Sequence, residues 1–160
     1  AASDAGAVAP QPAGQDAGPA EGAPDAGPVP DKRRPPSAQQ KKLHEAGLTL
    51  LRTKKYAALE KNAAGWVKRY PDDAMLRYLY GRGLFFQKKT REAAGELERA
   101  VSLDPEMFEA YYELGGVQLI LKNNTEAAQA LQRFLDLSPA DKRAPAVRAL
   151  LKKIKAGGEP

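Results

Sequence analysis

The sequence contains no cysteine among its 160 residues and a single histidine, His44. The missing thiols exclude disulfide bonds, thiolate metal sites and cysteine nucleophiles. His44 has no second metal ligand at helical spacing and no recognisable nucleophile to activate. No glycine-rich phosphate loop follows a strand, because no segment has a convincing strand pattern. We therefore expect no enzyme activity, no metal and no cofactor.

Long apolar runs are also missing, since no stretch approaches the about 18 apolar residues of a membrane-spanning helix. No signal peptide is recognisable either. The first residue is Ala1 rather than methionine, so we expect a processed product or an excised piece of a larger protein. Membrane tethering through an anchor before Ala1 remains open.

Residues 1–37 contain no Leu, Ile, Phe, Tyr or Trp, but hold eight of the 13 prolines and five of the 14 glycines. Without apolar side chains to bury, such a segment cannot offset the roughly 1–2 kcal/mol of backbone entropy lost per ordered residue. The triplet Asp-Ala-Gly recurs three times in it, as in low-complexity tethers. We predict a disordered Ala/Pro/Gly/Asp-rich tether over residues 1–37.

Charge is divided between the two parts of the chain, with a net charge of −2 on residues 1–37 and +7 on residues 38–160. In the second part lysine and arginine are mixed with aspartate and glutamate, which is typical of a solvated helical surface. We do not expect nucleic acid as the partner. A basic module for nucleic acid or an anionic membrane remains the alternative from another functional class.

Two residue types repeat with a period of 34 residues. Prolines stand at 71, 105 and 139, and glycines at 47, 81 and 115. Apolar residues between them follow the 3.6-residue period of amphipathic helices. The pattern predicts an all-α solenoid of three helix-turn-helix repeats, with helices over 39–52, 55–69, 74–87, 90–102, 107–121 and 124–136. A seventh helix is predicted over about 142–155.

The repeated unit resembles the tetratricopeptide repeat family, which has a 34-residue helix pair. The resemblance covers about residues 38–156 and divides them into repeats at about 40–73, 74–107 and 108–141. It is strongest in the third repeat, through Tyr111, Leu114, Gly115, Ala127, Leu131, Phe134 and Pro139. The second repeat carries Tyr80, Gly81, Leu84, Ala93, Leu97, Ala100 and Pro105, and the first carries Leu43, Ala46, Gly47, Leu50, Tyr56, Trp66 and Pro71.

The recurring glycines and prolines have structural explanations. A glycine inside a helix costs roughly 0.5–1 kcal/mol relative to alanine, so a repeated one indicates close approach by a neighbouring helix. We expect this at Gly47, Gly81 and Gly115, with Ala93 and Ala127 opposite the last two. Gly116 falls outside the pattern. Each proline should end a second helix.

The resemblance implies that the first helices line a concave groove with positions two, five, nine and twelve of each repeat. Tyr111 is then a core residue, Tyr112 faces the groove, and Gly116 opens room beside it. We predict partner-binding residues at ten of these positions: His44, Leu48, Met75, Tyr78, Arg82, Phe85, Glu109, Tyr112, Gly116 and Leu119. Lys41 and Leu51 share the same register.

Some family members hold a chaperone carboxylate with lysine and asparagine at groove positions, but His44 and Leu48 stand at such positions here. We therefore predict an apolar, aromatic groove that captures a peptide or helix of a partner protein. The chain is then a noncatalytic interaction or assembly module. Self-association into a homo-oligomer is the alternative among binding proteins.

The seventh helix is predicted to cap the solenoid with Val147, Leu150, Leu151 and Ile154, because the last repeat would otherwise expose its apolar face. Its cations, Lys142, Arg143, Arg148, Lys152, Lys153 and Lys155, are expected to stay in water. The composition of residues 1–37 is similar to tethers of bacterial envelope proteins, where such repeats assist assembly of larger machines. We expect a periplasmic or cell-envelope location, with the cytoplasm as the alternative.

Overall fold

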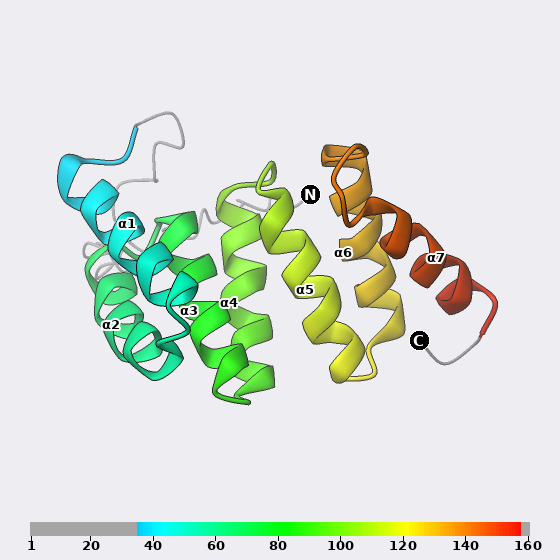
Figure 1. Cartoon of the computed structure of the whole chain (residues 1–160), viewed down its shortest axis with the longest axis horizontal. Helices are drawn as coiled ribbons and strands as arrows, with labels where there is room; N and C mark the ends of the chain where they lie inside the picture. Colours follow the sequence, from blue (N-terminus) through cyan, green and yellow to red (C-terminus); the bar gives the residue numbers. More distant parts are fainter. Residues whose placement is uncertain (1–34, 158–160) are drawn as a thin grey trace, which may run out of the picture. The chain divides into compact units, whose positions relative to one another are not determined.

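The computed structural model describes residues 35–157, and these contain seven α-helices and no strand (Figure 1). In chain order they are α1 (Ala38–Arg52), α2 (Tyr56–Arg69), α3 (Ala74–Phe86), α4 (Thr90–Leu103), α5 (Phe108–Ile120), α6 (Asn124–Leu137) and α7 (Ala144–Lys155). The predicted all-α class is confirmed. The predicted tether over residues 1–37 lies almost wholly outside the described residues.

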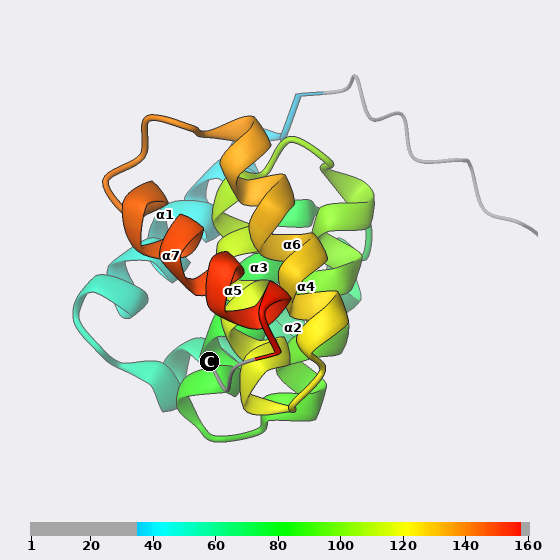
Figure 2. The same ribbon diagram turned by 90° about the vertical axis from the view of Figure 1, so that its right-hand side faces the viewer.

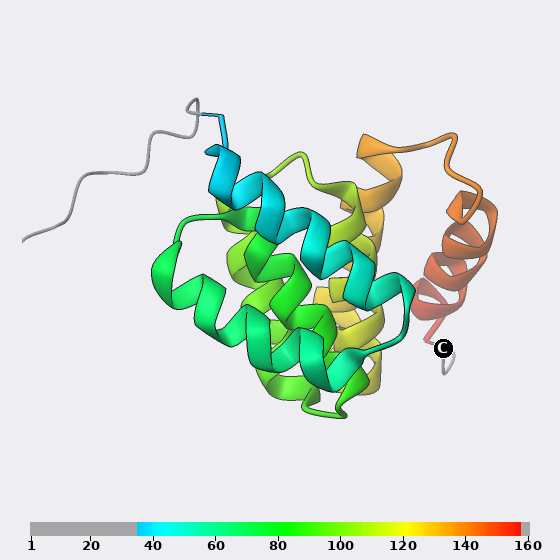
Figure 3. The ribbon, with the colours of Figure 1, turned by 60° about the vertical axis from the view of Figure 1, so that its left-hand side comes forward.

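The helices form antiparallel pairs, α1 with α2, α3 with α4 and α5 with α6, as Figures 1 and 3 show. Each pair stacks on the next, since α3 packs against both α2 and α4, and α5 packs against both α4 and α6. This is the predicted α-solenoid. The predicted capping helix starts at Ala144 rather than at 142, because Asp141 accepts hydrogen bonds from the backbone and side chain of Arg143 and closes a turn there.

The three second helices end two residues before a proline, at Arg69, Leu103 and Leu137. The residues directly before the prolines have left the helical conformation, with φ between −128° and −139° and ψ between 66° and 92°. Proline disfavours the α conformation in the residue that precedes it. The predicted stops at Pro71, Pro105 and Pro139 are confirmed.

The turns inside the helix pairs share a conformation that the sequence analysis missed. Lys54, Lys88 and Lys122, again 34 residues apart, have positive φ angles of 56°, 63° and 63°. In the α3–α4 turn the amide of Lys88 donates to Phe85 O and the amide of Lys89 donates to Leu84 O. The other two turns repeat this pair of bonds. Each first helix therefore ends in a Schellman motif, with lysine where glycine is usual.

Glycine brings the two helices of a pair into contact. A Cβ added at Gly115 would lie 2.6 Å from Leu131 Cγ, and one at Gly81 would lie 2.9 Å from Leu97 Cγ and 3.3 Å from Ala93 O. At Gly47 the nearest atom is Leu79 Cδ1 of the next pair, at 2.5 Å, followed by Trp66. The predicted close packing of a first helix on its own second helix is confirmed at Gly81 and Gly115, whereas the closest neighbour of Gly47 belongs to α3 of the next pair.

The buried side chains form two clusters. The first extends over α2 to α6 and includes Leu59, Leu79 and Leu97, each 0% exposed. The second joins α6 to α7, where Val147 and Leu151 of α7 pack with Phe134 and Leu135. Leu150 and Ile154 are half-buried against the same cluster. The predicted capping role of α7 is therefore confirmed.

Leucine at position 115 should destabilise the protein by more than about 2 kcal/mol, because its side chain would overlap Leu131 and force the α5–α6 crossing apart. Alanine at position 116 should be neutral or stabilise by roughly 0.5–1 kcal/mol, since nothing lies within 4 Å of its added Cβ. Urea denaturation of both variants measures the difference. Equal losses at the two positions would contradict this assignment of the buried glycine.

Glycine in place of Lys88 or Lys122 should raise the free energy of unfolding by about 0.5 kcal/mol. The left-handed conformation costs an L-residue roughly 1–2 kcal/mol, and glycine avoids this cost in the folded state. The greater conformational entropy of glycine in the unfolded chain offsets part of that gain, but not all of it. The control is Lys61→Gly on the exposed face of α2, which should lose roughly 0.5–1 kcal/mol. Thermal unfolding distinguishes the two signs, and a loss at Lys88 would contradict the strain argument.

Candidate functional site

A pocket of about 300 Å³ opens where α5 meets α3 and α7, and we name it the α5 pocket. Its wall comes from four helices and is mostly apolar. The lining residues are Phe85, Tyr112, Glu113, Gly116, Leu119, Ile120, Leu131, Ala146, Val147 and Leu150. Gly116 leaves its floor open, because nothing lies within 4 Å of a Cβ built there.

The ring of Tyr112 packs against two further side chains. It packs against the buried Phe134 with a centroid distance of 5.3 Å, and the guanidinium carbon of Arg143 lies 4.4 Å from its centroid. Arg143 is held in turn by Asp141, with Nη2 2.8 Å from Oδ2. Hydrogen bonds from Arg143 lower the pKa of Asp141 to about 2. Arg143 was expected in water with the other cations of the capping helix, and that expectation is wrong.

An ion pair borders the pocket on the side of α3. Arg82 Nη1 lies 3.3 Å from Glu113 Oε1 and donates a hydrogen bond to Tyr78 Oη at 3.2 Å. Burial raises the pKa of Glu113, although Arg82 and Arg143 act in the opposite direction. The Nε–H of Arg82 is buried without a hydrogen-bond partner. The wall therefore contains charges that are costly to bury, beside an apolar opening.

Four of the ten predicted binding residues line this pocket, namely Phe85, Tyr112, Gly116 and Leu119. Arg82 forms an ion pair with Glu113, which lines the pocket. Tyr78 differs from the prediction, because it is only 6% exposed and belongs to the first core cluster. Burial also raises the pKa of its hydroxyl. We expected an exposed anchor at Tyr78, and its truncation would instead open the core.

The other predicted residues lie away from the pocket. His44 is hydrogen-bonded to Asp73, with Nε2 2.9 Å from Oδ1 and 2.8 Å from Oδ2. Leu48 on α1 is 44% exposed, and Met75 is half-buried against the first cluster. Glu109 is half-buried. None of these four residues lines the α5 pocket.

Several residues that build the pocket wall are not among the predicted binding residues. Glu113 and Ile120 lie beside the predicted positions on α5, while Ala146 and Leu150 come from α7. A signal for the α7 residues was present. One further 34-residue step in the repeat register would have placed Arg143, Ala146 and Leu150 at groove positions. These three positions are absent from the predicted binding residues because residues 142–155 are predicted only as a capping helix.

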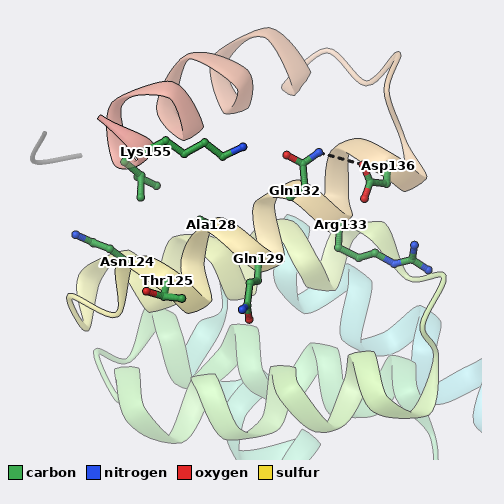
Figure 4. Close-up of a pocket in the computed structure, with 9 residues that line it drawn as sticks. Asn124, Thr125, Ala128, Gln129, Gln132, Arg133, Asp136 and Lys155 are labelled. Atoms are coloured by element: carbon green, nitrogen blue, oxygen red, sulfur yellow. Dashed lines mark hydrogen bonds between the residues drawn. The ribbon is translucent and has the colours of Figure 1, made fainter. Parts of the chain in front are cut away.

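A second pocket of about 650 Å³ lies between α6 and the end of α7 (Figure 4). Most of its lining residues have polar side chains, including Asn124, Gln129 and Arg133, but apolar atoms form most of the lining surface. Gln132 donates a hydrogen bond to Asp136 at 3.0 Å along the same face of α6. A further helix would pack here if the repeats continued.

The helices of residues 35–157 include no candidate for a membrane-spanning segment. Within residues 35–157, no group of three or more histidine, aspartate or glutamate side chains is placed to hold a metal ion.

Comparison with known proteins identifies the fold. Residues 81–142 match the family model described as tetratricopeptide repeat. No curated protein sequence matches the chain significantly.

Three solved structures are similar over 76% of this chain. The type III secretion chaperone SycD of Yersinia enterocolitica, in complex with a peptide of the translocator YopD, is 14% identical over 96% of its chain, with a TM-score of 0.67. The TPR2B domain of yeast Sti1, in complex with pHsp70, is 18% identical over 99%, with a TM-score of 0.66. The first TPR of Spaghetti (RPAP3), bound to an HSP90 peptide, is 22% identical over 94%, with a TM-score of 0.65.

Replacing Asp73 by alanine should destabilise the protein by roughly 1–3 kcal/mol, because Asp73 caps α3 through the amide of Leu76 and also accepts from His44 and Gln40. Burial alone would raise its pKa, but these hydrogen bonds lower it below 3.8. The contribution is therefore complete above that pH and is lost as the pH falls through the lowered pKa.

Urea unfolding of wild type and Asp73→Ala between pH 6 and pH 2 tests this expectation. The difference between the two proteins should shrink toward the acid end. Asp72→Ala is the control, since Asp72 is exposed and does not cap the helix. A difference that stays constant with pH would contradict the assigned role of the carboxylate.

Proposed function

We propose that this chain, whose residues 81–142 match the tetratricopeptide repeat family model, is a noncatalytic protein-interaction module that binds a peptide or helix of a partner protein at the α5 pocket. The observation that carries the proposal is the open floor at Gly116 between the ring of Tyr112 and the aliphatic wall of α7. An apolar side chain of a peptide fits such an opening. The pocket volume lies at the small end of the roughly 300–1,000 Å³ typical of ligand pockets, so we propose one or two anchoring side chains.

The charged border supports specificity. Arg82 and Glu113 lie beside the apolar wall and are partly exposed, with 22% and 17% of their side chains accessible. A peptide with an apolar anchor and neighbouring polar groups would complete the hydrogen bonds of this pair. Because burial raises the pKa of Glu113, the pair is costly for the free protein. A cost without benefit to stability is common where residues serve binding.

The similar structures support the same class of partner. The three structures are complexes with a peptide of YopD, with pHsp70 and with an HSP90 peptide, which is a property of those proteins. The proposal for this chain is narrower than the predicted groove, because Tyr78 is buried and His44 is paired with Asp73. Self-association through the same pocket is the second candidate, favoured by the 58% exposure of Ile120 at its rim. The location in a bacterial envelope stays a prediction.

Peptide selection on the full-length protein tests the proposal. A display library of random 12-residue peptides should yield binders with an apolar anchor. Gly116→Leu fills the pocket floor and should weaken the selected peptides at least tenfold. Gly65→Leu is the matched control, since it also adds a side chain to a helical glycine with nothing within 4 Å. Both variants should remain folded.

The outcomes separate the candidates. Selected peptides that bind Gly116→Leu as tightly as wild type would contradict binding at the α5 pocket. If no peptide is selected, light scattering over a range of concentrations should show association that Gly116→Leu abolishes. That result would favour self-association, and a monomer at every concentration without any selected peptide would overturn both.

A further inference from the structure

Lysines gather at one edge of the described solenoid. The α3–α4 turn and the α5–α6 turn lie at the same lower edge in Figures 1 and 2, and the last turn of α7 lies above that edge on the side of α6. We name these segments the basic edge, and its lysines are Lys88, Lys89, Lys122, Lys152, Lys153 and Lys155. All six are exposed.

Few acidic groups balance this edge. Glu92 and Glu126 lie in the first turns of α4 and α6, and Glu60 of α2 pairs with Lys89. Asp136 of α6 lines a hollow together with Lys152 and Lys155. The loops at the other end of the helix pairs differ, since they hold Asp72, Asp73, Asp104, Glu106 and Asp141. The positive excess of the folded part is therefore concentrated where the first helices end. The α1–α2 turn adds Lys54 and Lys55 at the corresponding end of its own pair.

Exposed apolar side chains accompany these lysines. Phe86 and Ile120, two residues before Lys88 and Lys122, are 37% and 58% exposed. They are two of the three large hydrophobic residues that are exposed in residues 35–157, and the third is Leu48 on α1. Apolar tips beside lysine side chains suit the boundary between lipid headgroups and acyl chains.

Backbone strain is an independent observation on the same turns. Lys88 and Lys122 adopt the left-handed conformation that glycine would adopt without strain. Their backbone amides make the Schellman bonds that any residue could make, so the fold does not require lysine at these positions. Strained residues concentrate where the side chain serves a function. The positive side chain is the property that these positions retain.

We propose that the basic edge docks on an anionic lipid surface, with Phe86 and Ile120 at headgroup level and the lysines paired with lipid phosphates and carboxylates. Nucleic acid fits the edge less well. One face of Phe86 is already stacked on Tyr56, with centroids 3.9 Å apart, and the aliphatic Ile120 offers no plane for a base. Peptide binding at the α5 pocket does not depend on this inference.

Co-sedimentation of the full-length protein with vesicles tests the proposal. Vesicles of phosphatidylserine and phosphatidylcholine in equal parts should bind the protein, and vesicles of phosphatidylcholine alone should not. The test variant combines Lys88→Gly, Lys122→Gly, Lys152→Gln and Lys155→Gln. Each lysine near an anionic surface changes binding about fivefold, so the variant should bind at least 50-fold more weakly. Its two glycines should stabilise the fold, which separates lost binding from unfolding.

Matched controls complete the test. Replacing Lys41, Lys42, Lys61 and Lys68 by glutamine removes as much charge away from the basic edge, and should change binding less than fivefold. Ile120→Ser should weaken vesicle binding several-fold and leave any binding to a short DNA duplex unchanged. Equal losses in both lysine variants would overturn the proposal, as would an absence of vesicle binding or tighter binding to the duplex than to the anionic vesicles.

Discussion

The contact between Gly115 and Leu131, repeated between Gly81 and Leu97, is the constraint on which the solenoid depends. A missing Cβ lets the two helices of a pair cross so closely that a leucine side chain fills the space. The crossing then fixes which face of each first helix remains free. In the third pair that face carries Tyr112 and Gly116, so packing on one side of α5 determines the opening on the other.

The α5 pocket combines parts with different energetic roles. Phe134 and Arg143 pack against the ring of Tyr112, so this part of the pocket wall is ordered before a ligand binds. Glu113 and Arg82 contribute charge that burial makes costly. Rigidity therefore comes from the capping region and electrostatic character comes from the adjacent pair. Helix α7 closes the core and also forms part of the pocket wall.

Much of the fold could be predicted because proline, glycine and apolar periodicity act locally. Pro105 and Gly115 have the same effect in any helix pair, so their spacing predicts the helix bounds within about two residues. The arrangement of the site could not be predicted in the same way, because it depends on contacts between residues that are far apart in the sequence. The register gives the direction of Tyr78 Cβ, but its burial follows from Arg82 and the packing of α5. Likewise, His44 meets Asp73 only because an interhelical loop places that carboxylate beside α1.

The single-sided attachment of α7 has a consequence for dynamics. Among the helices, α7 packs mainly against α6, whereas α3 and α5 are each held between two neighbours. Amide hydrogens of α7 should therefore exchange with solvent through a partial opening that leaves the rest of the array folded. Because Ala146 and Leu150 belong to the pocket wall, that opening also dismantles the site. Peptide binding at the pocket and slow amide exchange in α7 are then thermodynamically linked. A bound peptide would therefore slow the exchange of the α7 amides.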